Sequence, residues 1–155
     1  MTGKGKLTRR TLLGGSAMAG AALGLAPRRG DAALDEFPPG VQLRAAVIGC
    51  GGIATHHARV NFAPRFKVVA VCDVDRQRAE LYRNVAPDAK TICSDYRELL
   101  DRDDIDVVFV CTPDHWHTKI TVDALRSGKD VYCEKPLTFS VDEGRLIQQV
   151  LDETK

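Results

Sequence analysis

Residues 45–54 read Ala-Ala-Val-Ile-Gly-Cys-Gly-Gly-Ile-Ala, an apolar run that passes directly into a glycine-rich turn. The turn has the spacing G-x-G-x-x-A, and the segment after it has the length and pattern of a helix. A second apolar run ends at Asp73, about 20 residues beyond the turn, where dinucleotide-binding folds place an acidic residue. A strand, a glycine turn, a helix and an acid at this distance predict a dinucleotide-binding domain.

The physical role of each position in the turn follows from its side chain. Gly49 permits a tight turn, and Gly51 lets the backbone approach a pyrophosphate with no side chain in between. Ala54 is small enough for the helix to pack against the strand. The backbone N–H groups at the helix start, among them those of Gly52 and Ile53, face the phosphates together with the positive end of the helix dipole. These five residues are predicted to bind the cofactor.

Asp73 predicts the kind of dinucleotide. Its carboxylate can accept hydrogen bonds from the ribose hydroxyls of the adenosine half, and its charge repels a 2′-phosphate. We therefore expect NAD as the cofactor, although Arg76 and Arg78 lie close enough in the sequence to leave NADP possible. The competing interpretation is a glycine-rich turn between a strand and a helix that binds no ligand.

Apolar runs of strand length alternate with helix-length segments through the rest of the chain. Several runs are apolar on both faces, as expected of parallel strands that helices cover. The alternation predicts an α/β fold, a Rossmann-type doubly wound parallel sheet that binds ligands at the carboxyl ends of its first and fourth strands. Strands are expected at Leu43–Ile48, Phe66–Cys72, Thr91–Cys93, Val107–Cys111 and Val131–Cys133, and helices at Ile53–Phe62, Arg76–Asn84, Tyr96–Leu100 and His117–Ser127. A capping box from Ser140 to Glu143 predicts a last helix that runs to about Leu151.

The N-terminal segment has a different character. Four basic residues precede a mildly apolar stretch, residues 11–26, that several glycines interrupt. Residues 8–13 resemble a twin-arginine export signal, and Ala32 offers a cleavage position. We therefore predict a signal peptide over residues 1–32, a linker over 33–41 and the Rossmann domain over 42–155.

This signal predicts a periplasmic or otherwise exported protein, with the twin-arginine export machinery as its partner. The apolar stretch is too short and too rich in glycine for a stable membrane span. The competing interpretation is a disordered, mildly apolar tail.

Charge, cysteine and histidine patterns exclude other functions. The balance of 22 basic and 21 acidic residues argues against a nucleic-acid surface. The five cysteines follow predicted strands with no zinc-like spacing, so packing rather than a disulfide or a metal site is expected. Four histidines follow the first and fourth strands and could converge on the ligand crevice: His56, His57, His115 and His117. We expect them to cap helices or to face the substrate, and we predict no metal site.

Several motifs occur in the order found in one enzyme family. They are the turn at residues 49–54 with His57 after it, Asp73, the run Cys-Thr-Pro-Asp-His-Trp-His at 111–117, and Glu-Lys-Pro at 134–136. Over residues 43–151 the chain resembles the Gfo/Idh/MocA oxidoreductases, which transfer hydride between a nicotinamide cofactor and a hydroxyl compound. The resemblance implies an NAD(P)-dependent enzyme that acts on a sugar, a polyol or a related hydroxyl compound.

The resemblance also implies roles for individual residues. Lys135 is the catalytic lysine that reaches the substrate hydroxyl, and the peptide between it and the following proline is typically cis. Thr112, Pro113 and His117 flank the nicotinamide, and Glu134 holds the adjacent loop. A cation at the position of Lys135 can stabilise the charge that develops on the substrate oxygen.

One departure leaves the function open. Members of the family carry a further strand and a second α+β domain, which supplies most of the substrate pocket and a catalytic His or Asp. This sequence contains neither, so we expect a fragment or a truncated protein whose longer parent can form homo-oligomers. An NAD-dependent glycosidase of the same superfamily is an alternative, although that branch usually lacks the lysine of Glu-Lys-Pro. A non-catalytic NAD-binding fragment is the third interpretation.

Overall fold

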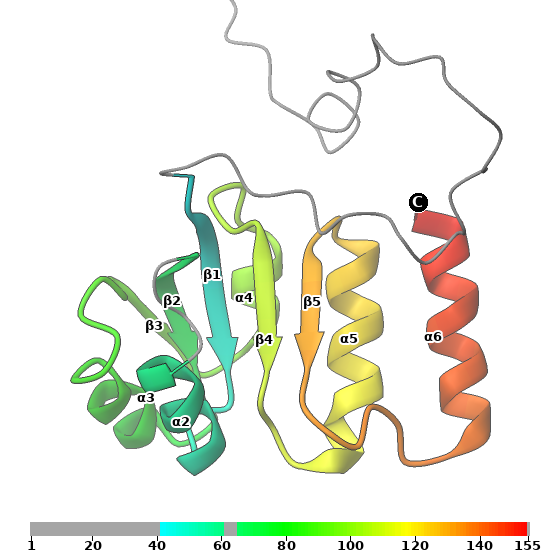
Figure 1. Cartoon of the computed structure of the whole chain (residues 1–155), viewed down its shortest axis with the longest axis horizontal. Coiled ribbons are helices and arrows are strands. Elements are labelled where there is room, and N and C mark those ends of the chain that lie inside the picture. The colour runs from blue at the N-terminus through cyan, green and yellow to red at the C-terminus, as the bar shows by residue number, and fades with distance from the viewer. Residues whose placement is uncertain (1–40, 61–64, 155) are drawn as a thin grey trace, which may run out of the picture. The chain divides into compact units, whose positions relative to one another are not determined.

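The computed structural model describes residues 41–60 and 65–154, and these form a parallel sheet covered by helices on both faces (Figure 1). The order of the strands is β3-β2-β1-β4-β5, and every neighbouring pair is parallel. The strands are β1 (Leu43–Ile48), β2 (Phe66–Cys72), β3 (Thr91–Cys93), β4 (Val107–Val110) and β5 (Asp130–Cys133). The chain proceeds outward from β1 to β3 and then returns to β4 beside β1. This order confirms the predicted doubly wound fold and puts the switch point between β1 and β4.

Helices follow the strands in the predicted alternation. They are α2 (Gly52–Val60), α3 (Arg76–Tyr82), α4 (Arg97–Leu100), α5 (His117–Arg126) and α6 (Val141–Thr154), with a short 3₁₀ turn, η1 (Asp114–Trp116), before α5. The predicted helix bounds differ from these by one to three residues at five ends, and the predicted end of the first helix, Phe62, lies outside the described residues. The 3₁₀ turn was not predicted; it forms because the N–H of Trp116 donates to the carbonyl of Pro113 at 2.9 Å.

The alternating side chains of β1 bury the two faces of the sheet in separate cores. Ala45 and Val47 pack with α2 and α3 on one face, whereas Ala46 and Ile48 pack with α4 and α5 on the other. Both faces of this strand are therefore apolar, as the unbroken apolar run in the sequence predicts. A third, smaller cluster of Val122, Ile147 and Val150 joins α5 to α6.

The capping box at the start of α6 is confirmed. The Ser140 hydroxyl accepts the N–H of Glu143 at 3.3 Å, and the Glu143 carboxylate accepts the N–H of Ser140 at 3.1 Å. The same carboxylate accepts the N–H of Phe139 at 2.6 Å. These backbone donors lower the pKa of Glu143 because they stabilise its charged form.

The cysteines pack as the sequence predicts. All five are free thiols, and four of them are buried at the end of a strand or one to two residues beyond it. Burial raises the pKa values of Cys50 and of Cys111 to about 12, so both stay protonated at neutral pH. They behave as small apolar side chains of the core.

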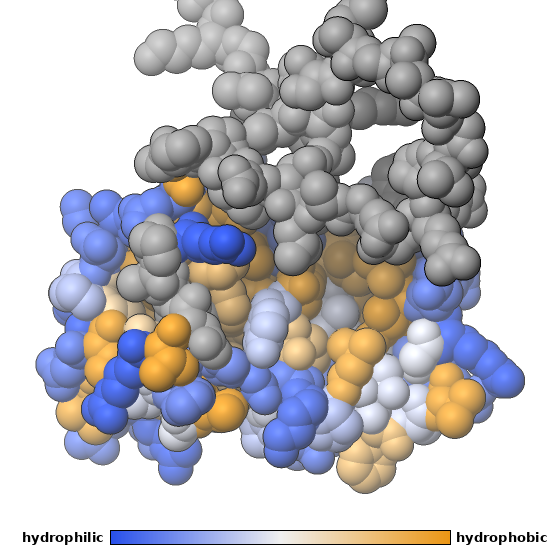
Figure 2. Space-filling view, in the orientation of Figure 1, coloured by the Kyte–Doolittle hydropathy of each residue, from blue (hydrophilic) through white to orange (hydrophobic). Residues whose placement is uncertain are grey.

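Surface polarity on the face in Figure 2 is mixed, with hydrophilic residues between separate hydrophobic patches. Large apolar side chains are exposed just after β5, at Leu137, Phe139 and Val141. Within residues 41–60 and 65–154, every helix is too short or too polar to cross a bilayer. The predicted signal peptide and nearly all of the predicted linker lie outside the described residues.

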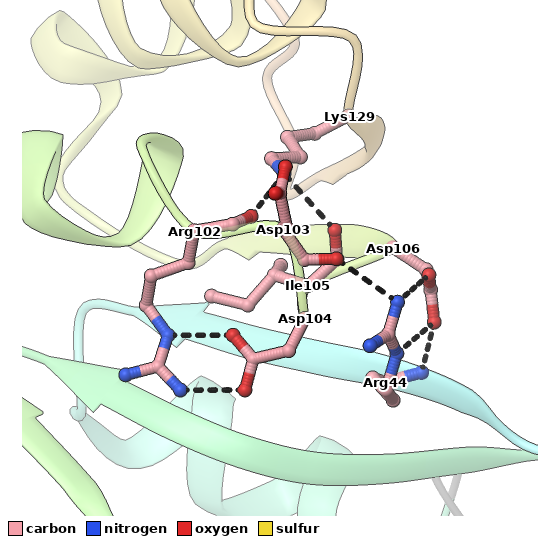
Figure 3. A network of polar contacts seen from close by, with 7 residues as sticks. All are labelled: Arg44, Arg102, Asp103, Asp104, Ile105, Asp106 and Lys129. Atoms are coloured by element: carbon pink, nitrogen blue, oxygen red, sulfur yellow. Dashed lines mark hydrogen bonds and ion pairs between the residues drawn. The ribbon is translucent and has the colours of Figure 1, made fainter. Parts of the chain in front are cut away.

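A network of charged residues fastens the edge of the sheet opposite the carboxyl ends of the strands (Figure 3). The Arg44 guanidinium donates to both carboxylate oxygens of Asp106, at 2.7 and 3.0 Å, and the Arg44 N–H donates to the same carboxylate at 2.8 Å. Lys129 donates to the carbonyls of Arg102 and Ile105. The starts of β1, β4 and β5 are thereby tied together. These contacts lower the pKa of Asp106, chiefly through the hydrogen bond from Arg44.

We expect Arg44→Ala to lower the free energy of unfolding by about 1–2 kcal/mol at neutral pH, because it removes two hydrogen bonds to a carboxylate. Urea denaturation measures the change. The matched control is Arg97→Ala, whose ion pair with Asp95 joins side chains that are 74% and 40% exposed, so solvent screens the pair and its loss should have a clearly smaller effect. Since the pKa of Asp106 is lowered in the fold, the stabilisation is present above pH about 4 and is lost as the pH falls through the lowered value. Equal effects of the two variants at neutral pH contradict the prediction.

Candidate functional site

The site begins where the loops after β1 and β4 meet, because parallel neighbours end at the same edge of the sheet. Gly49 has φ +89°, a conformation that side chains other than glycine rarely adopt. A Cβ at this position would lie 2.6 Å from the carbonyl oxygen of Cys111 and 2.8 Å from the N of Thr112. Glycine is therefore required both by the turn and by the close approach of the two loops.

The next two glycines face open space instead. Among the described residues, apart from the chain neighbours and the backbone of α2 itself, no atom lies within 4 Å of the position that a Cβ would take at Gly51 or at Gly52. As the first residues of α2, Gly52 and Ile53 have no intrahelical acceptor for their N–H groups. Ala54 is fully buried beneath the turn, where α2 packs on the sheet. The turn is thus an open cradle of backbone N–H groups, which suits an anionic ligand.

Asp73 lies at the end of β2 and orders this cradle. Its Oδ2 accepts the N–H of Cys50 at 2.8 Å, and its Oδ1 accepts the N–H of Asp75 at 2.9 Å. A carboxylate offers about four acceptor positions, so Asp73 keeps capacity for two more donors. The sequence predicted the acid beside the turn but not its hydrogen bond to the turn. Asp75 in turn caps α3 through the N–H groups of Gln77 and Arg78.

Two adjoining hollows open at this edge of the sheet. The larger, of about 530 Å³, follows the glycine turn, and the smaller, of about 360 Å³, extends across the end of β3; both are of a size that small ligands occupy. The residues common to both are Gly49, Asp73, Val74, Thr112 and Pro113. The larger also includes Gly51, Gly52, Ile53, Asp75, Arg78 and Cys111, and the smaller includes Ile48, Cys72, residues 94–97, Trp116 and Ile120. Seven of the predicted cofactor residues therefore line one crevice at the switch point. The contribution of residues 94–97 was missed, because their sequence carries no motif.

Lys135 lies in the turn after β5, the next strand beyond β4. Its side chain is exposed, its N–H donates to the Glu134 carboxylate at 3.3 Å, and the peptide to Pro136 is cis. Lys135, Glu134 and His117 line neither of the two hollows. The structure thus places the predicted catalytic lysine next to the crevice rather than within it.

Glu134 is buried and pairs with His57 of α2 through His57 Nε2. Burial by itself raises the pKa of Glu134, but the hydrogen bonds from His57 and from the Lys135 N–H outweigh it, and the pKa is lowered. The His57 ring also packs edge-on against Tyr132, with centroids 5.4 Å apart. Glu134 therefore joins α2 to the turn that carries Lys135.

His117 is the first residue of α5, and its side chain is almost wholly buried. Its Nδ1 lies 2.7 Å from the carbonyl oxygen of Pro136, and its Nε2 lies 2.7 Å from that of Thr112. By contrast, His56 and His115 are exposed. The sequence allowed all four histidines to converge on the crevice, and the structure shows that the two buried rings, His57 and His117, contact protein groups.

Comparisons with known proteins agree with this geometry. The model of the oxidoreductase family with an NAD-binding Rossmann fold, GFO_IDH_MocA, matches residues 43–155. The inositol 2-dehydrogenase of Burkholderia multivorans is 39% identical over 103 residues, which cover 64% of this chain and 30% of that protein. A glycosyl hydrolase family 109 protein of Saccharopolyspora erythraea is 33% identical over 159 residues, which cover 88% of this chain and 35% of that protein.

Among solved structures, a 3-ketoreductase from Actinomadura kijaniata in complex with NADP has a TM-score of 0.67 and 32% identity, over 73% of this chain and 36% of its own. The chain spans about a third of the length of the relatives that it matches. The family match, the sheet order and the glycine cradle lead to one conclusion: the chain belongs to the Gfo/Idh/MocA oxidoreductases and comprises their NAD-binding Rossmann domain.

Proposed function

We propose that this chain is the cofactor-binding part of an enzyme that transfers hydride between a nicotinamide and a hydroxyl-bearing carbon of a sugar, polyol or cyclitol. The observation that carries the proposal is the link between Asp73 and the glycine turn, made by the Cys50 N–H at 2.8 Å. This link presents a ribose acceptor and a phosphate cradle side by side at the switch point. The substrate class rests on relatives named as inositol dehydrogenases.

The residues of the crevice fit the cofactor. The N–H groups of Gly52 and Ile53 point from the start of α2, and no side chain fills the space above Gly51. Asp73 has acceptor capacity left for ribose hydroxyls. When bound, the nicotinamide supplies the site that takes up or releases hydride.

Lys135 acts at the substrate. Its ammonium group, in the turn after β5, donates a hydrogen bond to the oxygen of the reacting hydroxyl. In the reducing direction hydride adds to the carbonyl carbon of the substrate, the π electron pair moves onto the carbonyl oxygen, and the positive charge of Lys135 stabilises that oxygen while its N–H supplies the proton. Thr112 and Pro113 line the crevice in the loop after β4, next to β5, and would border the nicotinamide end of a bound cofactor.

Cofactor preference tests the role of Asp73. We expect the unaltered chain to bind NAD about tenfold or more tightly than NADP, because the carboxylate repels a 2′-phosphate. Asp73→Asn keeps an acceptor for the Cys50 N–H but removes the charge, so the gap between the two cofactors should narrow. Isothermal titration of each cofactor into each protein measures the affinities.

The counter-argument comes from Arg78, which lines the larger hollow near Asp73. Its guanidinium is paired with Asp75 at 3.3 Å, which leaves it less available to a 2′-phosphate. NADP binding as tight as NAD binding by the unaltered chain would falsify the proposed preference.

Export is a separate part of the proposal. Residues 1–32 carry the twin-arginine pattern, and that pathway moves proteins that are already folded. A cofactor taken up before export also stabilises the fold that the pathway requires. We propose that the exported enzyme retains its NAD and recycles it by oxidising one substrate and reducing another. Denaturing the purified exported protein should release nearly one equivalent of nicotinamide cofactor. A purified protein that releases none contradicts the proposal that the exported enzyme retains its NAD.

A second candidate function is NAD-dependent cleavage of a glycosidic bond without net redox change. The observation that favours it is the match to a family 109 glycosyl hydrolase protein over 88% of the chain, which is more than the Rossmann domain alone. The presence of Lys135 argues for the oxidoreductase. Turnover of a glycoside with no net nicotinamide reduction would select the glycosidase.

A further inference from the structure

The turn that carries Lys135 is held on both sides by buried histidines from different helices. On the N-terminal side, His57 of α2 pairs with the Glu134 carboxylate. On the C-terminal side, His117 of α5 contacts the carbonyl oxygen of Pro136 at 2.7 Å. The residues immediately before and after the lysine are thus both tied to the body of the domain.

The His57 contact is buried and involves a carboxylate. Side chains of His57 and Glu134 are only 7% and 10% exposed. The other oxygen of the carboxylate, Oε2, accepts the N–H of Lys135. One carboxylate therefore connects the α2 histidine to the backbone of the lysine itself, and little water competes for it.

The His117 contact is double. One ring nitrogen faces the Pro136 carbonyl and the other faces the Thr112 carbonyl, so the ring bridges the turn after β5 to the loop after β4. Thr112 lines both hollows of the cofactor crevice. The ring is therefore a direct connection between the crevice wall and the Lys135 turn.

Both helices start at the crevice. α2 begins at Gly52 of the phosphate cradle, and α5 begins four residues after Pro113. A histidine on each helix therefore fixes the position of the Lys135 turn relative to a loop that lines the cofactor crevice.

We propose that His57 and His117 are positioning residues, which fix Lys135 at a set place relative to the bound nicotinamide without touching cofactor or substrate. This inference rests on the proposed function, since it assumes that Lys135 acts at the substrate. Losing either histidine loosens the turn at residues 134–138 and slows the chemical step, whereas cofactor affinity stays nearly the same.

Amide hydrogen exchange on the chain itself tests whether the two histidines hold the turn at residues 134–138 in place. In His57→Leu we expect the amides of Lys135, Leu137 and Thr138 to exchange about tenfold faster than in the unaltered chain, in line with the loss of one buried hydrogen bond. His57→Gln, which retains a donor near the position of Nε2, should exchange at close to the original rate. Amides of β1 and β4 serve as internal references, because general destabilisation accelerates them as well.

At His117 the two contacts can be separated. Asparagine places its amide near the position of Nδ1, and glutamine places its amide near that of Nε2. In His117→Asn the Pro136 contact should therefore remain, and amides of the turn should exchange as slowly as in the unaltered chain. In His117→Gln the Pro136 contact is lost, and the same amides should exchange faster. His56→Gln and His115→Gln are matched controls, since both residues are exposed neighbours of the buried rings.

Steady-state kinetics on the protein expressed from its complete reading frame tests whether loss of either histidine slows the chemical step. His57→Leu and His117→Gln should lower kcat by about tenfold or more with the dissociation constant for NAD unchanged, and His57→Gln should recover most of the loss. Unchanged exchange in the turn, equal acceleration in β1 and β4, or a loss confined to NAD affinity overturns the inference. An unaltered protein that transfers no hydride contradicts the proposed function alone, because the exchange experiment needs no substrate.

Discussion

Lys135→Ala is expected to lower kcat by about 10²–10³-fold, with the dissociation constant for NAD nearly unchanged. The lysine lies outside both hollows that the cofactor residues line, so its removal takes nothing from the cradle or from Asp73. What disappears is the positive charge that stabilises the substrate oxygen in the transition state. Steady-state kinetics on the protein from its complete reading frame, together with calorimetric titration of NAD, separates the two quantities.

The matched control for this variant is Lys90→Ala. Lys90 is an exposed lysine before β3 that lines neither hollow, so its loss should leave kcat unchanged. A tenfold or greater loss of NAD affinity in Lys135→Ala, with kcat preserved, would assign the lysine to cofactor binding instead of chemistry.

Gly49→Ala should destabilise the domain by about 2–5 kcal/mol, because a side chain is strained at φ +89° and its Cβ collides with backbone. The colliding atoms, the Cys111 carbonyl and the Thr112 N, belong to the loop after β4 and cannot rotate away as a flexible side chain can. The displaced loop also forms the wall of the crevice, so NAD binding should be lost together with stability. Urea denaturation and NAD titration measure the two effects.

Gly51→Ala is the control that separates binding from folding. Apart from its chain neighbours, no atom of the described residues lies within 4 Å of the new Cβ, and Gly51 has no positive φ, so the free energy of unfolding should change by less than about 1 kcal/mol. The methyl group would nevertheless stand where the pyrophosphate approaches, and NAD affinity should fall about tenfold or more. If Gly51→Ala binds NAD normally, the phosphates do not lie on this turn.

Local patterns in the sequence predict most of the fold. The apolar run at residues 45–48 specifies a strand buried on both faces, and the structure divides its side chains between two cores. The glycine turn and Asp73 could be recognised because their spacing lies within one βαβ unit. Eight of the ten strand ends agree with the prediction, whereas helix ends were less accurate, since caps and a 3₁₀ turn depend on single backbone hydrogen bonds such as that of Trp116.

The roles of the buried histidines could not be predicted in the same way. His57 and Glu134 are 77 positions apart, and His117 and Pro136 are 19 apart, so these contacts arise only when α2, α5 and β5 pack around one edge of the sheet. The sequence pattern placed all four histidines near that edge. It did not distinguish a ring that faces a ligand from one that faces a backbone carbonyl.

The two backbone hydrogen bonds of Asp73 constrain how this domain can evolve or be engineered toward a different cofactor. The carboxylate that we propose discriminates against a 2′-phosphate also accepts the Cys50 N–H of the phosphate cradle. A substitution that removes both the charge and the acceptor therefore reduces the discrimination between NAD and NADP. It also removes the hydrogen bond that holds the Cys50 N–H, so the glycine turn is less well fixed. A lineage that adopts NADP has to supply a new cation for the 2′-phosphate and also a replacement acceptor for the Cys50 N–H, such as a serine or an asparagine. Variant libraries that place residues without such an acceptor at position 73 should yield mostly weak binders of both cofactors.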